Sequence, residues 1–411
     1  MRVLFVHQNF PAQYLHLAAA LAADPDAEVV ALTMNGFRDP RGRIRSVRYV
    51  PSRGSSRQIH PWAGDFETKI IRGEAAYRAA MALRAEGFTP DVMCIHPGWG
   101  EGILLRDVWP EAQVLLYCEY YYSSVGADVS FDPEFPDIDT AGRIAGKNAS
   151  NLLHLEIATA GVAPTAWQKS SFPAWFRPAI SVIHDGIDTD IVRPLPDARV
   201  ELAGRCLTRA DEVVTFVNRN LEPYRGYHRF MRALPELMRR RPEAHVLIVG
   251  GDGVSYGAKP PDGRSWKDIF LDEVRGSLDH DRLHFLGRLP YGRFLSVLQL
   301  SRVHVYLTYP FVLSWSLLEA MSSGCAVVAS RTPPLLDVIE DGKTGRLIDF
   351  FNQEELVSTI DDLLDDPEGR AGLGAAARRA VRSTCDLRRI CLPAQMRLLS
   401  ALAPRRRGVS R

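Results

Sequence analysis

The chain has 411 residues, of which 46% are hydrophobic and 24% are charged, and its formal net charge is +1. This length exceeds what one hydrophobic core usually serves, so we expect two domains. The balanced charge gives no reason to expect nucleic-acid binding, and no uninterrupted apolar stretch approaches the roughly 20 residues that span a bilayer.

The two ends of the chain and its cysteines give expectations about the cellular compartment of the protein. The apolar run at 3–6 is too short for a signal peptide and predicts a buried first strand. The six cysteines lie far apart without paired ligand spacing, which argues against a zinc site or a disulfide framework and fits a reducing cytoplasm. The basic cluster 405–407 is either a solvated tail or a peripheral contact with anionic lipid at the inner face of a membrane.

Apolar strand candidates alternate with amphipathic helices, a pattern typical of α/β domains with parallel sheets. A Pro-containing segment at 187–196 separates two such series, so we expect two doubly wound domains. The first series of predicted strands is 3–6, 29–33, 92–95, 114–117 and 182–183, and the second is 213–217, 245–249, 283–285, 303–307 and 326–329.

Ligands of open parallel sheets bind beyond the carboxyl ends of the strands, so the residues that follow each strand are candidates for a site. Asn9 and Gln13 follow the first strand, and His96 and Trp99 follow the third. The glycine-spaced turn around Trp99 does not have the dinucleotide-binding spacing. Trp99 offers a face to a sugar ring or packs between helices.

Glu119 follows the predicted strand 114–117 and precedes the tyrosines 120–122. A carboxylate at this place can orient a substrate hydroxyl or receive its proton, and the tyrosines can stack on a sugar. The alternative is that Glu119 pairs with an Arg or His and that the tyrosines are core residues.

The second series carries cationic and glycine-containing turns. Arg219 follows the first predicted strand of this series by two residues, and Arg225 precedes a glycine. Gly253 closes a Gly-Gly-Asp-Gly turn after the next strand, and Gly287 and Arg288 follow the strand 283–285.

The segment 309–330 predicts a loop, a short helix, a glycine stop and a buried strand. The loop places Ser314, Trp315 and Ser316 at the helix start, where unpaired N–H groups and the helix dipole favour a phosphate. Glu319 lies one turn further on. The alternative is a capping box, in which Ser316 and Glu319 tie down the start of the helix.

This segment resembles the donor-site signature of the retaining family 4 glycosyltransferases of the GT-B fold. Glu319-Ala-Met and Gly324 match the second half of the signature, whereas Phe311 stands where the family has its first Glu. Asp185 begins an Asp-Gly-Ile-Asp turn that resembles the family's Asn-Gly-Ile/Val-Asp turn, and Arg225 stands in place of the family's Lys.

The resemblance implies two Rossmann-like domains that face a central cleft. Residues 1–190 would form the acceptor-side domain and residues 191–385 the nucleotide-sugar-binding domain. Residues 386–411 would form a helix, at 392–402, that returns to the first domain, followed by the basic tail.

The resemblance also implies a reaction, in which a sugar moves with retention from a UDP- or GDP-linked donor to a hydroxyl of a glycan, lipid-linked or small-molecule acceptor, as in bacterial glycan or polysaccharide assembly. The implied donor-binding residues are Arg219, Arg225, Gly253, Gly287, Arg288, Ser314, Trp315, Ser316 and Glu319. Glu119 and His96 would be catalytic on the acceptor side, with Asn9, Gln13 and Trp99 in the acceptor or phosphate loop.

The segment from Arg219 to Arg225 resembles the family's phosphate clamp, but its spacing is one residue longer than in the family. Either a bulge displaces Arg219 or Asn220 takes its place. We expect no cofactor and no required metal, and we interpret the Asp-x-Asp sequences at 137–139 and 188–190 as turns. Two alternatives remain for the function: a non-catalytic nucleotide-sugar sensor, suggested by Phe311, and a nucleotide-sugar epimerase on the same fold.

Overall fold

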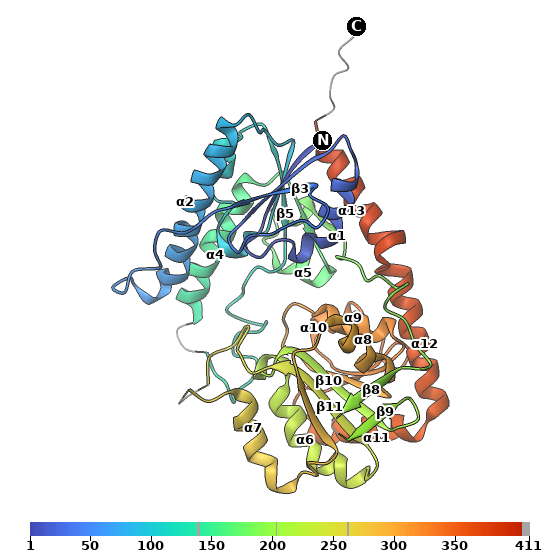
Figure 1. Ribbon diagram of the computed structural model, residues 1–411. Coiled ribbons are helices and arrows are strands. Elements are labelled where there is room, and N and C mark those ends of the chain that lie inside the picture. Colours follow the sequence, from blue (N-terminus) through green and yellow to red (C-terminus); the bar gives the residue numbers. More distant parts are fainter. Residues whose placement is uncertain (138–139, 203, 261–262, 405–411) are drawn as a thin grey trace. The chain divides into compact units, whose positions relative to one another are not determined.

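The computed structural model describes residues 1–137, 140–202, 204–260 and 263–404, and divides into two compact units (Figure 1). Unit 1 comprises Met1–Val129, Pro136–Gly186 and Arg388–Arg411, and unit 2 comprises Ser130–Phe135 and Ile187–Leu387. In the described part of the chain, no helix has both the length and the apolar character required to cross a membrane. The residues 138–139 and the basic cluster 405–407 lie outside the described residues.

Unit 1 is built on a seven-stranded sheet with the order β3-β2-β1-β4-β5-β6-β7, in which all pairings are parallel. Its helices flank the sheet (Figure 1). The strands are β1 (Arg2–Val6), β2 (Glu28–Thr33), β3 (Ile44–Arg48), β4 (Val92–Ile95), β5 (Gln113–Tyr117), β6 (Ala160–Ala163) and β7 (Ile180–Val182). The helices are α1 (Leu15–Ala23), α2 (Gly64–Ala85), α3 (Leu105–Val108), α4 (Thr140–Ile157), α5 (Ala166–Ser171) and α13 (Leu392–Leu402).

Unit 2 is built on a six-stranded parallel sheet with the order β12-β11-β10-β13-β14-β15, and an antiparallel hairpin, β8-β9, accompanies it. Its strands are β8 (Arg199–Leu202), β9 (Arg205–Thr208), β10 (Val213–Asn220), β11 (His245–Gly251), β12 (Leu283–Gly287), β13 (Val303–Tyr306), β14 (Ala326–Ser330) and β15 (Arg346–Ile348). Its helices are α6 (Tyr227–Arg240), α7 (Trp266–Val274), α8 (Tyr291–Leu300), α9 (Trp315–Ser322), α10 (Pro333–Leu336), α11 (Gln353–Asp365) and α12 (Pro367–Thr384).

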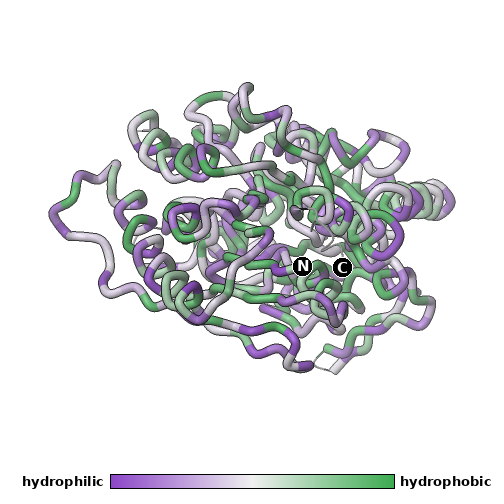
Figure 2. Tube along the Cα trace, turned by 90° about the horizontal axis from the view of Figure 1, so that it is seen from above, coloured by the Kyte–Doolittle hydropathy of each residue, from purple (hydrophilic) through white to green (hydrophobic). Residues whose placement is uncertain are grey.

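The central strands of both sheets are almost entirely buried, whereas most of the helices expose one face. Figure 2 shows hydrophobic and hydrophilic residues alternating along the helices, as expected for helices that pack one face on a sheet. The prediction of two doubly wound α/β domains is confirmed.

The strand order reverses between β1 and β4 in unit 1 and between β10 and β13 in unit 2. At such a switch point the connections leave in opposite directions, and the carboxyl ends of the strands are open to a ligand. The sequences that follow these strands therefore form the candidate sites of the two units.

A short segment of the chain leaves unit 1 and packs on unit 2. Ser130–Phe135 belongs to unit 2, although unit 1 contains the residues on both sides of it. Phe131 packs against Tyr309 and Phe350, and Phe135 packs against Trp266. We call this segment the strap. The later return of the chain to unit 1 brings α13 against α1.

The glycine-spaced turn that follows β4 packs closely on the helices of unit 1. Gly100 has a φ of +94°, and a Cβ atom there would lie 2.4 Å from the carbonyl oxygen of Lys69. A Cβ atom on Gly102 would lie 2.9 Å from the ring of His154. These glycines therefore serve helix packing.

Replacing Gly100 by alanine should destabilise the protein by roughly 2–4 kcal/mol, because the left-handed backbone and the overlap with Lys69 both oppose a side chain. Gly87 provides a matched control, since its φ is +91° and no atom lies within 4 Å of its Cβ position. Gly87→Ala should cost only about 1 kcal/mol. Thermal denaturation of the two variants measures the difference, and equal losses would refute a packing role for Gly100.

Candidate active site

A pocket of about 370 Å³ opens in unit 2 at the carboxyl ends of β10 and β11 and at the start of α9. It combines guanidinium groups, serine hydroxyls and apolar side chains. Its lining comprises Val217, Asn218, Arg219, Val249, Gly250, Arg288, Leu289, Phe294, Ser314 and Ser316. The structure thus brings together four of the predicted donor-binding residues, namely Arg219, Arg288, Ser314 and Ser316.

A shift of register in β10 between Val217 and Asn220 sets the directions of the side chains there. Arg219 is exposed at the pocket, whereas Asn220 is buried. The Asn220 Oδ1 atom accepts a hydrogen bond of 3.0 Å from Arg288 Nη2, and its amide nitrogen donates to Ser255 Oγ at 2.7 Å. Asn220 therefore holds Arg288 beside Arg219.

The start of α9 faces the same pocket. Ser314 is the N-cap, and its Oγ atom accepts the N–H of Ser316 at 3.3 Å. The N–H of Ser314 donates to the hydroxyl of Tyr306 at 2.8 Å, which fixes the loop before the helix. Because Ser314 caps the helix, Ser316 is a helical residue, and the alternative of a Ser316–Glu319 capping box is wrong.

Glu319 is one turn further along α9 and is 8% exposed. Its Oε1 atom accepts a hydrogen bond of 2.8 Å from the hydroxyl of Tyr291, at the start of α8. Burial raises the pKa of Glu319, and the hydrogen bond from Tyr291 opposes this effect. Tyr291 has no counterpart among the residues predicted from the sequence.

The structure places Arg225 beneath the loop that precedes α9. Arg225 is 4% exposed, and its Nη1 atom donates to Thr308 Oγ1 at 2.8 Å, to the carbonyl oxygen of Val312 at 3.0 Å and to the hydroxyl of Tyr306 at 3.3 Å. In this position Arg225 supports the loop and, through Tyr306, the backbone of Ser314. The phosphate contact predicted for Arg225 stays a prediction.

The remaining predicted donor-site residues surround this loop and the pocket. Gly253 lies next to Asn220, and Gly287 ends β12 with a φ of +62°. Trp315 is 42% exposed at the start of α9. Phe311, which replaces the family's first Glu, is 5% exposed and packs against Tyr224 and Tyr256. An apolar contact therefore occupies this position.

In unit 1, a polar cluster forms where β1, β4 and β5 end. Val6 pairs with Ile95, and Ile95 pairs with Leu116, so His7 and His96 lie side by side with their ring centroids 5.1 Å apart. His96 Nε2 lies 3.4 Å from Glu119 Oε2, and Gln13 Nε2 donates to Glu119 Oε1 at 3.2 Å.

The structure thus brings together the predicted residues His96, Gln13 and Glu119. The pairing of Glu119 with a histidine, one of the two alternatives, is observed, and its contact with an acceptor hydroxyl stays a prediction. The Glu119 side chain is 38% exposed, whereas that of His96 is 2% exposed.

Aromatic rings enclose the cluster. Trp99 packs with its ring centroid 4.5 Å from each of His7 and His96, and Tyr117 stacks on His96 at 5.2 Å. Trp99 therefore packs on the two histidines, and its contact with a sugar ring stays a prediction. Asn9 is exposed, and its side chain accepts a hydrogen bond from Asn35.

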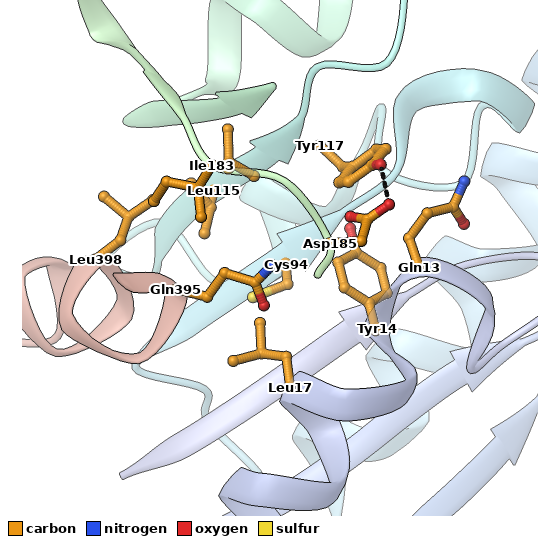
Figure 3. Close-up of a pocket in the computed structure, with 11 residues that line it drawn as sticks. Gln13, Tyr14, Leu17, Cys94, Leu115, Tyr117, Ile183, Asp185, Gln395 and Leu398 are labelled. Carbon is orange, nitrogen blue, oxygen red and sulfur yellow. Dashed lines mark hydrogen bonds between the residues drawn. The ribbon is translucent and has the colours of Figure 1, made fainter. Parts of the chain in front are cut away.

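A small cavity lies behind the cluster, between the sheet, α1 and α13 (Figure 3). Its volume of about 20 Å³ suits one water molecule. The hydroxyl of Tyr117 donates to Asp185 Oδ2 at its wall, at 2.9 Å, so Asp185 supports the ring that stacks on His96. Asp185 is 6% exposed. In the structure, Asp185 therefore anchors the hydroxyl of Tyr117.

Among the described residues, one group of side chains lies close enough to hold a metal ion: Asp132, Glu134 and His228. Arg229 lies 3.2 Å from Asp132, and Arg232 lies 2.7 Å from Glu134. These guanidinium groups already balance the carboxylates, which disfavours a cation. At the second Asp-x-Asp sequence, the N–H of Asp190 donates to Asp188 Oδ1, as in a turn.

Two family models match the chain. The model described as glycosyl transferase family 4 group matches residues 25–192, and the model described as glycosyl transferases group 1 matches residues 207–380. The chain belongs to the family 4 glycosyltransferases of the GT-B fold.

Curated relatives match about half of the length of this chain. A GDP-mannose-dependent alpha-(1-6)-phosphatidylinositol monomannoside mannosyltransferase of Mycolicibacterium smegmatis is 30% identical over 52% of this chain and 54% of the relative. A D-inositol 3-phosphate glycosyltransferase of Corynebacterium aurimucosum is 29% identical over 48% of this chain and 46% of the relative. The chain spans about half the length of the curated relatives it matches.

Solved structures match over nearly the whole chain. The sucrose-phosphate synthase of Thermosynechococcus elongatus has a TM-score of 0.73 and 20% identity, with 98% of each chain covered. The Anabaena protein HepE in complex with UDP and glucose has a TM-score of 0.65 and 16% identity, with 97% of this chain and 100% of the other covered. These similarities show the shared GT-B fold.

Proposed function

We propose that this protein transfers a sugar from a nucleoside-diphosphate sugar to an acceptor hydroxyl, with retention of configuration at the anomeric carbon. The observation that carries the proposal is the unit 2 pocket, where Arg219, Arg288 and the N-terminus of α9 meet. Guanidinium groups and unpaired helical N–H groups are suited to a diphosphate. Glu319, on the same helix, would accept hydrogen bonds from the ribose hydroxyls.

In the proposed step the bond between the anomeric carbon and the phosphate oxygen breaks, and its electron pair stays on the nucleoside diphosphate. The acceptor oxygen forms the new bond to the anomeric carbon on the same face, and its proton passes to the departing phosphate oxygen. The cations at the pocket stabilise the negative charge that develops on the leaving group. Glu119 and His96 would orient the acceptor hydroxyl.

The relatives suggest the class of donor and acceptor. One acts, by its name, with GDP-mannose on a phosphatidylinositol mannoside, another on D-inositol 3-phosphate, and the Anabaena structure holds UDP and glucose. We therefore propose a GDP- or UDP-linked hexose as donor and a glycan, lipid-linked or small polyol acceptor, as in bacterial glycan assembly. The free cysteines suit the cytoplasm, and a lipid-linked acceptor would require peripheral contact with a membrane.

We further propose that no metal ion is required, because Arg219, Arg288 and the helix N-terminus can together neutralise the diphosphate. Transfer that persists in EDTA would support this proposal, and transfer that is restored only by an added divalent cation would contradict it.

The function is tested by nucleotide release from a panel of UDP-, GDP- and ADP-sugars, with and without a pool of polyol, glycan and lipid-linked acceptors. Acceptor-dependent release from one donor would support a transferase and name that donor. Binding of a donor without release would instead favour a nucleotide-sugar sensor, for which the apolar environment of Phe311 is the motivating observation. A changed sugar without an acceptor would indicate an epimerase.

Replacing Tyr291 by phenylalanine should shift the acidic limb of the activity profile to higher pH. The hydrogen bond from Tyr291 lowers the pKa of Glu319, so its loss raises that pKa, and the carboxylate is protonated at a higher pH. We expect kcat/KM to change less at pH 8 than at pH 5, because the replacement acts through the acidic limb. The measurement is kcat/KM for the donor between pH 5 and 8. If the acidic limb of this profile does not shift, the ionisation of Glu319 does not control donor recognition.

A further inference from the structure

We propose that His7 and Gln13 are positioning residues that hold the Glu119 carboxylate in a single orientation toward the acceptor hydroxyl. The proposal rests on the proposed transferase function, in which Glu119 faces the acceptor. It assigns Gln13 a supporting role in place of the acceptor contact that the sequence suggests, and it adds His7, which sequence patterns did not indicate.

The backbone fixes the tautomer of His7. The N–H of Asn9 donates to His7 Nδ1 at 2.9 Å, so this nitrogen carries no proton and the other ring nitrogen, Nε2, carries it. His7 Nε2 then donates to Gln13 Oε1 at 2.9 Å. His7 is 1% exposed, and burial, with the neighbouring His96, lowers its pKa to about 3. The ring is therefore neutral near pH 7, and its donor direction is constant.

The hydrogen bond from His7 also fixes the amide of Gln13. Because Gln13 Oε1 accepts from His7, the Nε2 atom of Gln13 faces Glu119 and donates to its Oε1 atom at 3.2 Å. A flipped amide would place its NH₂ group against the His7 N–H and its oxygen against the carboxylate, so both contacts would become repulsive. The three hydrogen bonds therefore run in one direction, from the Asn9 backbone to Glu119.

His96 acts on the other oxygen of the carboxylate. The N–H of Gly98 donates to His96 Nδ1 at 3.1 Å, so Nδ1 is an acceptor and the ring N–H lies on Nε2, which is 3.4 Å from Glu119 Oε2. Gln13 thus faces one oxygen and His96 the other. The two histidines follow β1 and β4, the neighbouring strands at the switch point, and their backbone clamps are alike.

The exposure of the carboxylate leaves room for a substrate. The side chain of Glu119 is 38% exposed while both histidines are buried. An acceptor hydroxyl can therefore reach Glu119, whereas His7 acts only through Gln13. A constant orientation of the carboxylate raises the fraction of bound acceptors in a reactive geometry, which affects kcat more than acceptor binding.

The test uses the full-length protein with the donor and acceptor found by the panel, and compares His7→Leu, Gln13→Leu and His7→Gln. We expect His7→Leu and Gln13→Leu each to lower kcat roughly ten- to hundredfold, with little change in acceptor KM. His7→Gln should recover most of the activity, because its terminal amide can donate to Gln13 Oε1. In a Glu119→Gln background, the two leucine variants should lower kcat little further.

Several results would overturn the proposal. A rise in acceptor KM for Gln13→Leu but not for His7→Leu would indicate that Gln13 contacts the acceptor directly. Losses that remain additive in the Glu119→Gln background would show that the two residues act elsewhere. A wild-type protein without transfer activity would overturn the proposed function and this role with it.

An NMR measurement tests the hydrogen-bond chain without activity. The ¹⁵N shifts of labelled histidine in the wild-type protein should show His7 as the neutral tautomer protonated on Nε2 at pH 7, with His7→Gln identifying its signal. A tautomer protonated on Nδ1, or a charged ring, would exclude the chain even if the protein proved to be a transferase.

Discussion

Glu319→Ala should lower kcat/KM for the nucleotide-sugar donor by about a hundredfold. A hydrogen bond to a charged group contributes roughly 1.5–3 kcal/mol, and the proposed carboxylate accepts from two ribose hydroxyls in a buried position, where Glu319 is 8% exposed. The measurement is donor-dependent nucleotide release at donor concentrations below KM, together with the dissociation constant of the nucleoside diphosphate.

Glu319→Gln is the matched control, since it keeps the volume of the side chain and can still bond to Tyr291, but it lacks the charge. We expect kcat/KM of the glutamine variant to lie between that of the wild type and that of the alanine variant. If both variants bind the nucleotide as the wild type does and only their thermal stability falls, Glu319 is a structural partner of Tyr291 and not a ribose ligand.

The central strands of both sheets could be predicted from the sequence because they are uniformly apolar. The strand at 92–95 was predicted with its observed bounds, and the other interior strands differ mostly at their ends. In β7 the prediction of 182–183 was displaced, since the strand is Ile180–Val182. The strands that were not predicted lack the apolar signal.

Those strands are β3, β6, β15 and the hairpin β8-β9. The edge strand β3 mixes apolar, polar and charged residues, and the edge strand β15 has only three residues. In β6, Gly161 is required because a Cβ atom there would lie 2.6 Å from Cys118 Sγ, a constraint that only the packed structure shows. Edge strands and close packing depend on neighbours that are distant in the sequence.

The part of the candidate site that could be predicted is the part whose residues have their place fixed by a short local motif. The start of the helix at 314–316 and the place of Glu319 one turn further on follow from local sequence, whereas the choice of Ser314 as the cap in place of Ser316 does not. The contact between His7 and His96 depends on the register of β1 against β4, and the partners of Arg225 come from β13 and the loop after it. Sequence patterns contain neither of these distant contacts.

The strap Ser130–Phe135 is held on unit 2 by a buried carboxylate that no sequence pattern indicated. Asp132 is 0% exposed, accepts from His228 Nε2 at 2.9 Å and from Arg229 Nη2 at 3.2 Å, and also accepts the N–H of Glu134 at 3.0 Å. Burial opposes ionisation of Asp132, but these hydrogen bonds prevail and lower its pKa. The Asp132 carboxylate thus balances the charge of Arg229 and fixes the side chains of His228 and Arg229, which hold the strap.

Asp132→Ala should therefore destabilise the protein by about 3 kcal/mol, because His228 and Arg229 lose their buried partner. Glu134→Ala is the matched control: this side chain is 36% exposed and pairs with Arg232, so its loss should cost less than about 1 kcal/mol.

Acid should also destabilise the wild-type protein through these groups. Because burial lowers the pKa of His228 below its ordinary value of 6.5, the unfolded chain takes up a proton first, and stability falls as the pH drops below about 6.5. The lowered pKa of Asp132 adds a further loss at lower pH, as the pH falls through its folded value. Urea denaturation at pH 7.5 and pH 5 measures the effect of His228, and a further measurement near pH 3 measures that of Asp132. Equal destabilisation by Asp132→Ala and Glu134→Ala would show that the strap is held by its phenylalanine contacts and not by the buried carboxylate.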